Sequence, residues 1–277
     1  MPLAEVNGIR FHHTDTGPPP GRPDAETIVF GHGLLFSGWM FEPQVEALRE
    51  EYRCVTVDWR GQGGTPPVAG SDGYVADMDS LLDDLLALLD HLGLPAVHYV
   101  GLSMGGFVGM RLAARHPERV RTLALLDTSA GPEDPEKVSQ YRLLATVYRW
   151  LGFGPVRGRV EPLMFGPTLL DSPRRDEVVE PWLATLRTVD RKGMRAAILG
   201  VTDRLPVVDE LANIEAPTLV AVGADDVATP VAKSEAIASG IAGARLEVIA
   251  DAGHSSTVEQ PEAVTALLRE HLAAAGR

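Results

Sequence analysis

Apolar runs of strand length alternate with longer stretches of helical period along most of this 277-residue chain. Runs such as TIVF, CVTV and VHYVGL are apolar at nearly every position, which is typical of strands buried on both faces of a sheet. Each is followed by a helical stretch, as in a parallel sheet whose two faces are covered by helices. The alternation therefore predicts an α/β fold.

The expected elements can be placed by residue number. We expect a hairpin over 4–17, with its turn at Asn7-Gly8, on one edge of the sheet. The expected strands cover 27–33, 54–61, 97–103, 122–128, 216–226 and 244–254. The expected helices cover 41–51, 77–93, 105–117, 230–241 and 261–274.

Residues 128–217 interrupt the alternation. This segment is too long for a loop in a compact domain, so it should carry structure of its own. Its Tyr, Trp, Leu and Arg spacings look helical, and its prolines should divide it into short helices. These prolines are Pro155, Pro162, Pro167, Pro173 and Pro181. We therefore expect an α/β core over 1–127 and 218–277, with a helical unit over 128–217.

Composition and charge exclude several function classes. The formal net charge of −13 argues against nucleic-acid binding, which needs clustered Lys and Arg. No secretory signal opens the chain, and no apolar run reaches the ~18 residues of a membrane helix, so we expect a cytoplasmic protein without membrane contact. Cys54 is the single cysteine and is expected to be buried. With no Cys/His cluster of ligand spacing and no phosphate loop, neither a metal nor an organic cofactor is expected.

The stretch GLSMGG places Ser103 where a predicted strand gives way to a helix. The corner is either a tight packing turn or a device that presents a nucleophile. Gly101 and Gly105 permit the close backbone approach that a strained serine needs. Acyl transfer would also need two N–H groups for the developing oxyanion, and the backbones of Met104 and Leu34 are the candidates.

A serine hydroxyl needs a base and a group that orients the base. His254 follows the last predicted strand, where it can reach the carboxyl edge of the sheet, and is the preferred base. Only His32, just past an earlier strand, competes with it, and we interpret His32 as shaping a loop. For the acid, Asp225 and Asp226 are both within reach by sequence.

With Ser103 and His254 in this order, the chain resembles the α/β-hydrolase superfamily, whose nucleophile, acid and histidine follow one another along the chain. Gly223, Asp226 and Pro230 match the placement of the acid in many members, so the resemblance favours Asp226 over Asp225. The run DWRGQGGT is similar to a structural loop of the family, although Thr65 stands where serine is usual. GLSMGG and VEQPEA look most like the 3-oxoadipate enol-lactonase and carboxylesterase branch.

The resemblance implies a mostly parallel eight-stranded sheet flanked by helices, with residues 128–217 as a helical cap inserted after the sixth strand. It also implies hydrolysis of a small-molecule ester or lactone through an acyl-enzyme, by a monomer or homodimer. A carbon–carbon hydrolase of vinylogous diketones, a cofactor-free perhydrolase or haloperoxidase, and a slow-turnover ligand receptor are the alternatives.

Substrate contacts are expected from aromatic residues near or within the cap. The residues expected to bind substrate are Trp39, Tyr141, Trp150, Phe165 and Trp182, and Tyr148, Phe153 and Met164 are further candidates for the same pocket. Several arginines are either a carboxylate fork or solvated helix faces. These are Arg142, Arg149, Arg187, Arg191 and Arg195.

Overall fold

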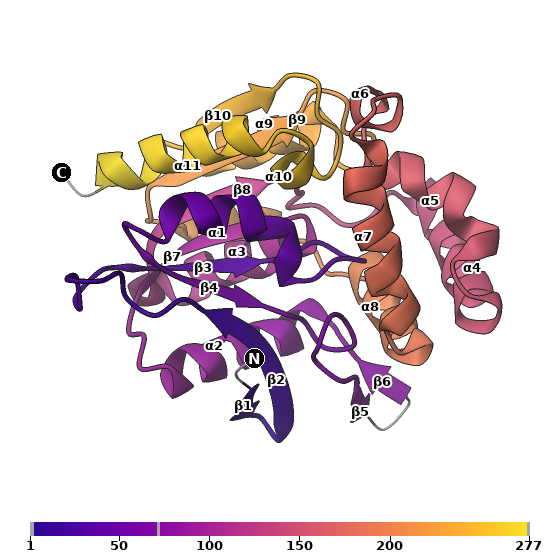
Figure 1. Ribbon diagram of the computed structural model, residues 1–277, viewed down its shortest axis with the longest axis horizontal. Coiled ribbons are helices and arrows are strands. Elements are labelled where there is room, and N and C mark those ends of the chain that lie inside the picture. Colours follow the sequence, from indigo (N-terminus) through magenta and orange to yellow (C-terminus); the bar gives the residue numbers. More distant parts are fainter. Residues whose placement is uncertain (1–2, 71–72, 276–277) are drawn as a thin grey trace.

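The computed structural model describes residues 3–70 and 73–275 and contains an eight-stranded sheet in the order β1-β2-β4-β3-β7-β8-β9-β10 (Figure 1). Its strands are β1 Leu3–Val6, β2 Ile9–Asp15, β3 Thr27–Gly31, β4 Arg53–Val57, β7 Val97–Leu102, β8 Val120–Leu126, β9 Thr218–Gly223 and β10 Arg245–Ile249. From β4 to β10 every neighbouring pair is parallel. The predicted α/β fold with a mostly parallel eight-stranded sheet is confirmed.

The antiparallel edge is the hairpin of β1 and β2, which joins the sheet through β4. Its turn residues Asn7 and Gly8 have φ values of 49° and 75°. Positive φ at both central positions is the requirement of a two-residue type I′ turn, and Asn-Gly meets it with little strain. The expected hairpin is therefore present at this edge.

Helices cover both faces of the sheet. On one face, α2 (Met78–His91), α3 (Met104–Arg115) and α9 (Val231–Gly240) pack against one buried apolar cluster. On the other face, α1 (Glu42–Leu48) and α11 (Pro261–Ala275) pack against a second cluster. Because both faces are covered, the central strands are buried along their whole length, which explains their continuous apolar runs.

The segment between β8 and β9 is helical. Its helices are α4 Pro135–Leu151, α5 Arg157–Met164, α6 Pro167–Leu170, α7 Arg175–Thr188 and α8 Arg191–Thr202. Figure 1 shows them grouped at one end of the sheet, beyond the carboxyl ends of the parallel strands. The segment follows the sixth strand of the eight-stranded sheet, as expected.

The expectation that every proline ends a helix is wrong at two positions. Pro162 lies inside α5 and Pro181 inside α7. Both prolines are exposed, as are Gly158 and Glu177, whose carbonyl groups lose their usual intrahelical donor. Since these carbonyl groups lie on the solvent side, water can replace the missing N–H groups and the helices continue.

Short elements escaped the sequence patterns. The strands β5 (Val68–Gly70) and β6 (Gly73–Val75) pair antiparallel outside the main sheet. Elements of three residues are too short to show a period. The remaining helix is α10 Ser256–Glu259, and 3₁₀ turns cover Gly38–Phe41, Pro117–Arg119, Gly154–Val156 and Val208–Asn213. Among the residues described, no helix combines the length and apolarity needed to cross a bilayer.

Candidate active site

Ser103 occupies a strained turn between β7 and α3. Its φ of 51° is rare for a residue with a side chain. Its N–H donates to the Leu126 carbonyl (2.9 Å), and its carbonyl accepts from the Thr128 hydroxyl (2.8 Å). These bonds to the neighbouring strand hold the turn in its unfavourable conformation, so that the hydroxyl projects from the sheet edge.

Two glycines of GLSMGG, Gly101 and Gly105, are required by close backbone contacts. A Cβ on Gly105 would lie 1.9 Å from the carbonyl oxygen of Gly31, and one on Gly101 would lie 2.4 Å from the carbonyl oxygen of Gly105. Neither site has room for any side chain. These glycines are therefore needed because the backbone at the start of α3 lies in close contact with β3 and β7.

His254 links Ser103 to a carboxylate. Its Nε2 lies 2.9 Å from Ser103 Oγ, and its Nδ1 lies 2.8 Å from Asp226 Oδ2. Asp226 also accepts hydrogen bonds from the N–H groups of Ala228 and Thr229 and from the Thr229 hydroxyl. The structure thus brings Asp226 to the histidine, while among the residues described Asp225 bonds only through its backbone N–H, to the Ala252 carbonyl.

The charged forms of His254 and Asp226 stabilise each other. Burial by itself lowers the pKa of His254, but the charge and hydrogen bond of Asp226, together with the other acidic groups nearby, outweigh it, so the pKa lies above the usual value of 6.5. Burial likewise acts to raise the pKa of Asp226, while His254 and the Thr229 donors bring it below its ordinary value. Asp226 therefore stays ionised and stabilises the imidazolium form of His254.

Asp127 is a second buried carboxyl near the same histidine. It directly follows β8 with a φ of 46°, accepts from the Gly223 N–H (2.8 Å) and contacts the Ser256 hydroxyl. Burial, and then the charge of Asp226, raise its pKa well above the ordinary value. Two nearby carboxylates cannot both ionise cheaply, so Asp127 carries the proton and Asp226 the charge.

His32 shapes the loop after β3, as interpreted from the sequence. Its Nδ1–H donates to the Gly33 carbonyl (2.7 Å), and its Nε2 accepts from the Trp59 N–H (3.0 Å). Burial lowers its pKa, in agreement with a neutral ring that donates at one nitrogen and accepts at the other. Both ring nitrogens of His32 are thus bonded to backbone groups, one in its own loop and one in the loop after β4.

Gln62 fixes the part of this loop that faces Ser103. Its Oε1 accepts from the N–H of Leu35 (2.9 Å), a residue with a φ of 69°, and its Nε2 approaches the Met104 sulfur. The N–H groups of Leu34 and Met104 have no acceptor among the residues described. Two unused donors thus remain on the two segments that flank Ser103.

Glu259 holds the loop that carries His254. Its carboxylate accepts from the N–H groups of Gly253 (3.0 Å) and Ser255 (3.0 Å), on either side of the histidine. It also accepts from the N–H of Gly166 (2.8 Å), between α5 and α6. One buried side chain therefore fixes the histidine loop and ties the helical segment to it.

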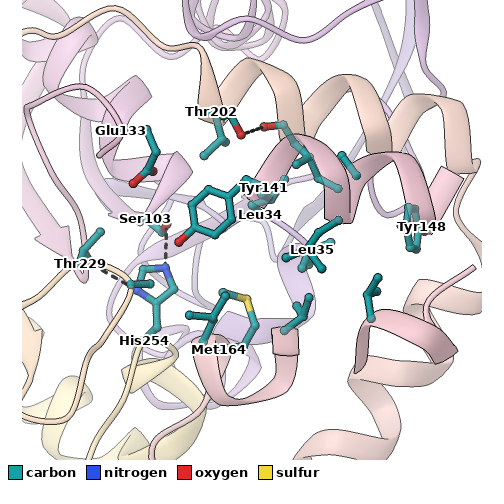
Figure 2. Close-up of a pocket in the computed structure, with 18 of the residues that line it drawn as sticks. Leu34, Leu35, Ser103, Glu133, Tyr141, Tyr148, Met164, Thr202, Thr229 and His254 are labelled. Atoms are coloured by element: carbon teal, nitrogen blue, oxygen red, sulfur yellow. Dashed lines mark hydrogen bonds between the residues drawn. The ribbon is translucent and has the colours of Figure 1, made fainter. Parts of the chain in front are cut away.

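A mostly apolar cavity opens above Ser103 and His254 (Figure 2). Residues of the helical segment form most of its wall, and the loops carrying Leu34 and Thr229 complete it. Its lining residues are Leu34, Leu35, Ser103, Phe107, Glu133, Tyr141, Leu144, Ala145, Tyr148, Phe153, Val156, Val160, Leu163, Met164, Ile198, Val201, Thr202, Ala228, Thr229 and His254. Such a lining suits a small organic ligand with one reactive group at the serine.

The aromatic residues expected to bind substrate divide into two groups by their position relative to the cavity. Tyr141 lines the cavity, as do Tyr148, Phe153 and Met164. The other four aromatic residues expected to bind substrate lie outside the lining: Trp39, Trp150, Phe165 and Trp182.

These four side chains lie outside the cavity lining for different reasons. Trp150 lies on the outer face of α4, 71% exposed, with the Arg149 guanidinium over its ring. Phe165 and Trp182 are fully buried, with ring centroids 5.1 Å apart, and the Trp182 indole N–H donates to the Leu35 carbonyl (3.0 Å). Trp39 is half-buried and packs against Phe36. The buried Phe165 and Trp182 rings also contact Phe36, and so join the helical segment to the loop that carries Leu34 and Leu35.

The alternative of solvated helix faces fits the arginines of the segment. None of the five lines the cavity: Arg142, Arg149, Arg187, Arg191 and Arg195. Arg142 pairs with Asp203 at the surface. The charged side chain that does face the cavity is Glu133, which no motif singled out.

Sequence reasoning also missed Gln62, Asp127 and Glu259. Gln62 lies within DWRGQGGT and Glu259 within VEQPEA, two runs that resemble the family but predict no chemistry by themselves. Their roles depend on backbone N–H groups from distant loops, which the sequence does not display. In the described ranges, no group of three or more His, Cys, Asp or Glu side chains is arranged to hold a metal ion.

Comparison with known proteins places this geometry in a family. Residues 26–163 match the family described as alpha/beta hydrolase fold. The chain is 30% identical over 244 residues to 3-oxoadipate enol-lactonase 2 of Acinetobacter baylyi, covering 88% of this chain and 87% of that one. It is 28% identical to a Caulobacter protein provisionally named a carbamate hydrolase (RutD), covering 98% of both chains.

A solved structure extends the likeness to three dimensions. A thermophilic esterase from Thermogutta terrifontis is 33% identical, with a TM-score of 0.87 over 99% of this chain and 97% of that one. The match therefore includes both the core and the helical segment. The chain belongs to the α/β-hydrolase fold family, and its relatives support hydrolase activity.

Proposed function

We propose that this protein is a serine hydrolase that cleaves carboxylic esters, including lactones, through an acyl-enzyme. The observation that carries the proposal is the hydrogen-bonded chain from Asp226 Oδ2 through His254 to Ser103 Oγ, with distances of 2.8 and 2.9 Å, at the floor of an apolar cavity. A nucleophile, a base and a group that orients the base are the three parts that acyl transfer requires.

The proposed mechanism begins at the serine hydroxyl. Ser103 Oγ attacks the ester carbonyl carbon while His254 Nε2 takes its proton, and the carbonyl π electrons move onto oxygen. The resulting imidazolium is stabilised by the Asp226 carboxylate. The N–H groups of Leu34 and Met104 are the proposed donors to the oxyanion, and removing one such donor typically costs about 3 kcal/mol of transition-state stabilisation.

The intermediate then collapses. The carbonyl re-forms, the bond to the alcohol oxygen breaks, and His254 gives its proton to the departing alcohol, leaving the acyl group on Ser103. Water attacks the acyl-enzyme with His254 again as base, and release of the acid restores the serine hydroxyl. A lactone follows the same steps, except that the alcohol and the acid leave as one molecule.

Residues 128–217 are the proposed cap of this site. Their helices supply most of the cavity wall, and the apolar side chains among them suit an acyl chain or another uncharged group. Differences in this segment would then account for differences in substrate among relatives, because function resides in the site rather than in the fold.

The test is steady-state hydrolysis of p-nitrophenyl esters from acetate to octanoate by the purified protein and by Ser103→Ala. We expect kcat/KM on the order of 10⁴ M⁻¹s⁻¹ for the best ester and a loss of roughly 10³-fold or more in the variant. Ser239→Ala, an exposed serine on α9, is the matched control and should retain full activity. Equal rates for the wild type and Ser103→Ala would contradict the proposal.

Two parallel substrates separate the ester assignment from its alternatives. A p-nitrophenyl carbamate tests the activity named for the Caulobacter relative, and a vinylogous diketone tests carbon–carbon hydrolysis. Ser103-dependent turnover of either compound without turnover of the esters would retain the nucleophile and reject the ester assignment.

A further inference from the structure

We infer that Glu133 gives the cavity a charge preference: esters with a neutral or cationic group near the scissile bond are accepted, and esters with a carboxylate there are rejected. The inference rests on the proposed function, because it names the class of substrate that the same site takes. Within the described residues, Glu133 is the one carboxylate of the lining, and the lining contains no Lys or Arg.

Glu133 lies at the polar end of the cavity. Figure 2 shows its side chain on one side of Ser103 and Tyr148 at the opposite end. The Phe153 ring lies 6.4 Å from the Tyr148 ring, and Val156 and Val160 belong to the same lining. A bound ester must therefore place one half in an apolar compartment and the other half beside Glu133.

The Glu133 carboxylate is held in place by an ion pair and by a backbone donor. Its Oε2 accepts from Arg204 Nη1 (3.0 Å), and its Oε1 accepts from the Asp134 N–H (3.0 Å). The side chain of Glu133 is 9% exposed and that of Arg204 is 2% exposed, so this ion pair is poorly screened by solvent. A carboxylate is acceptor-only, so it can offer a hydrogen bond to a hydroxyl, amide N–H or ammonium group of a ligand, but none to another carboxylate.

Arg204 lies behind Glu133 and is not part of the lining. Its Nη1 also donates to the Val201 carbonyl (2.8 Å), and its guanidinium lies 4.2 Å over the Phe107 ring. A carboxylate of the substrate would thus meet the negative partner of the ion pair first. At the opposite end it would meet mostly apolar side chains and the hydroxyl of Tyr148, without a cationic partner, and burying such a charge is costly.

The opposite charge preference, for substrates with a carboxylate, would depend on Arg204. Its Nε and Nη2 are buried without hydrogen-bond partners among the residues described. If Glu133 moved aside, these donors could turn to a substrate carboxylate, and the charge preference would be reversed. A lactone formed from a dicarboxylic acid keeps one carboxylate, so the two arrangements predict opposite behaviour toward such lactones.

The experiment compares matched esters that differ in charge but hardly in shape. One pair carries the charge in the alcohol half: 3-carboxyphenyl butyrate and 3-carbamoylphenyl butyrate, with 3-(aminomethyl)phenyl butyrate as the cation. The other pair carries it in the acyl half: mono-p-nitrophenyl succinate and p-nitrophenyl succinamate. We expect wild-type kcat/KM to favour the carboxamide over the carboxylate by roughly 10-fold or more in both pairs.

Glu133→Gln should reduce the carboxamide-to-carboxylate ratio of kcat/KM at least several-fold in only one pair, the one whose charged half lies beside residue 133. The same variant should also hydrolyse the cationic ester less well relative to the carboxamide. Glu136→Gln, an exposed neighbour on α4, is the matched control and should leave every ratio unchanged. The wild-type ratios do not depend on whether Glu133→Gln folds, so they test the charge preference by themselves.

Two results would overturn the inference. The first is that the carboxylates are hydrolysed as fast as or faster than the carboxamides in both pairs, which would indicate Arg204 as their partner. The second is that a folded Glu133→Gln variant has the same carboxamide-to-carboxylate ratios as the wild type. If phenyl butyrate itself is not hydrolysed, the proposed function fails separately. Calorimetric binding of the same esters to Ser103→Ala then measures the charge preference without catalysis.

Discussion

His254 Nε2 lies 2.9 Å from Ser103 Oγ, although the two residues are 151 positions apart in the chain. Ser103 follows β7 and His254 follows β10, so each stands past the carboxyl end of a parallel strand. Parallel strands bring such loops to one edge of the sheet. The short distance therefore depends on the hydrogen bonds and packing contacts that hold each loop in place, and each of these contacts can be tested separately.

The two buried aspartates should behave differently when replaced. Asp226→Asn removes the charge that stabilises the His254 imidazolium, and we expect kcat to fall by about 10²- to 10⁴-fold. Asp127→Asn replaces a carboxyl whose raised pKa keeps it protonated, and Asn tolerates the positive φ of this position, so the loss should stay within about 3-fold. Ester hydrolysis by both variants checks this, and a larger loss in Asp127→Asn would reverse the assignment.

The pH profile should report the protonation of His254. The imidazolium cannot take the Ser103 proton, so kcat/KM should fall as the pH drops through the pKa of His254 in the free enzyme. Because Asp226 holds this pKa above 6.5, the acid limb should have its midpoint above pH 6.5. Asp226→Asn should move the midpoint lower. A wild-type midpoint near pH 5 would show that another group controls the limb.

Much of the fold could be predicted from sequence because its signals are local. The buried strands are apolar throughout, and Asn7-Gly8 meets the demands of a type I′ turn by itself. Ser103 and His254 are placed by the strands that precede them. The acid was less certain, since Asp225 and Asp226 differ by one position and only the folded loop decides which one faces the imidazole.

The cavity wall could not be predicted in the same way. Trp150 and Tyr148 lie two positions apart on α4, yet one is exposed and the other lines the cavity. Which face of a helix turns inward depends on its packing against α8 and the loops of the core, and aromatic composition does not encode it. Glu133 was missed because its partner Arg204 lies 71 positions away.

Gly105 should tolerate no side chain. In Gly105→Ala the new methyl group would overlap the Gly31 carbonyl oxygen, so either α3 or β3 must shift. We expect a loss of roughly 3 kcal/mol or more in the free energy of unfolding, measured by urea denaturation, together with loss of activity. Gly158→Ala in α5 is the control, because its Cβ meets no atom within 4 Å and alanine favours helix. Equal stability of the two variants would contradict the close contact.

Glu259 should act as a positioning residue for His254. In Glu259→Gln the amide group can accept through one atom only, so at least one of the N–H groups of Gly253, Ser255 and Gly166 loses its acceptor or faces another donor. We expect kcat to fall by roughly 10-fold with little change in KM, because the imidazole moves relative to Ser103 while the cavity wall remains. The negative charge of Glu259 also raises the pKa of His254, so the acid limb of the pH profile should move to lower pH in the variant. Glu262→Gln, on the exposed first turn of α11, is the control and should change neither quantity. A variant that loses stability but keeps the wild-type kcat and pH profile would show that Glu259 only holds the fold together.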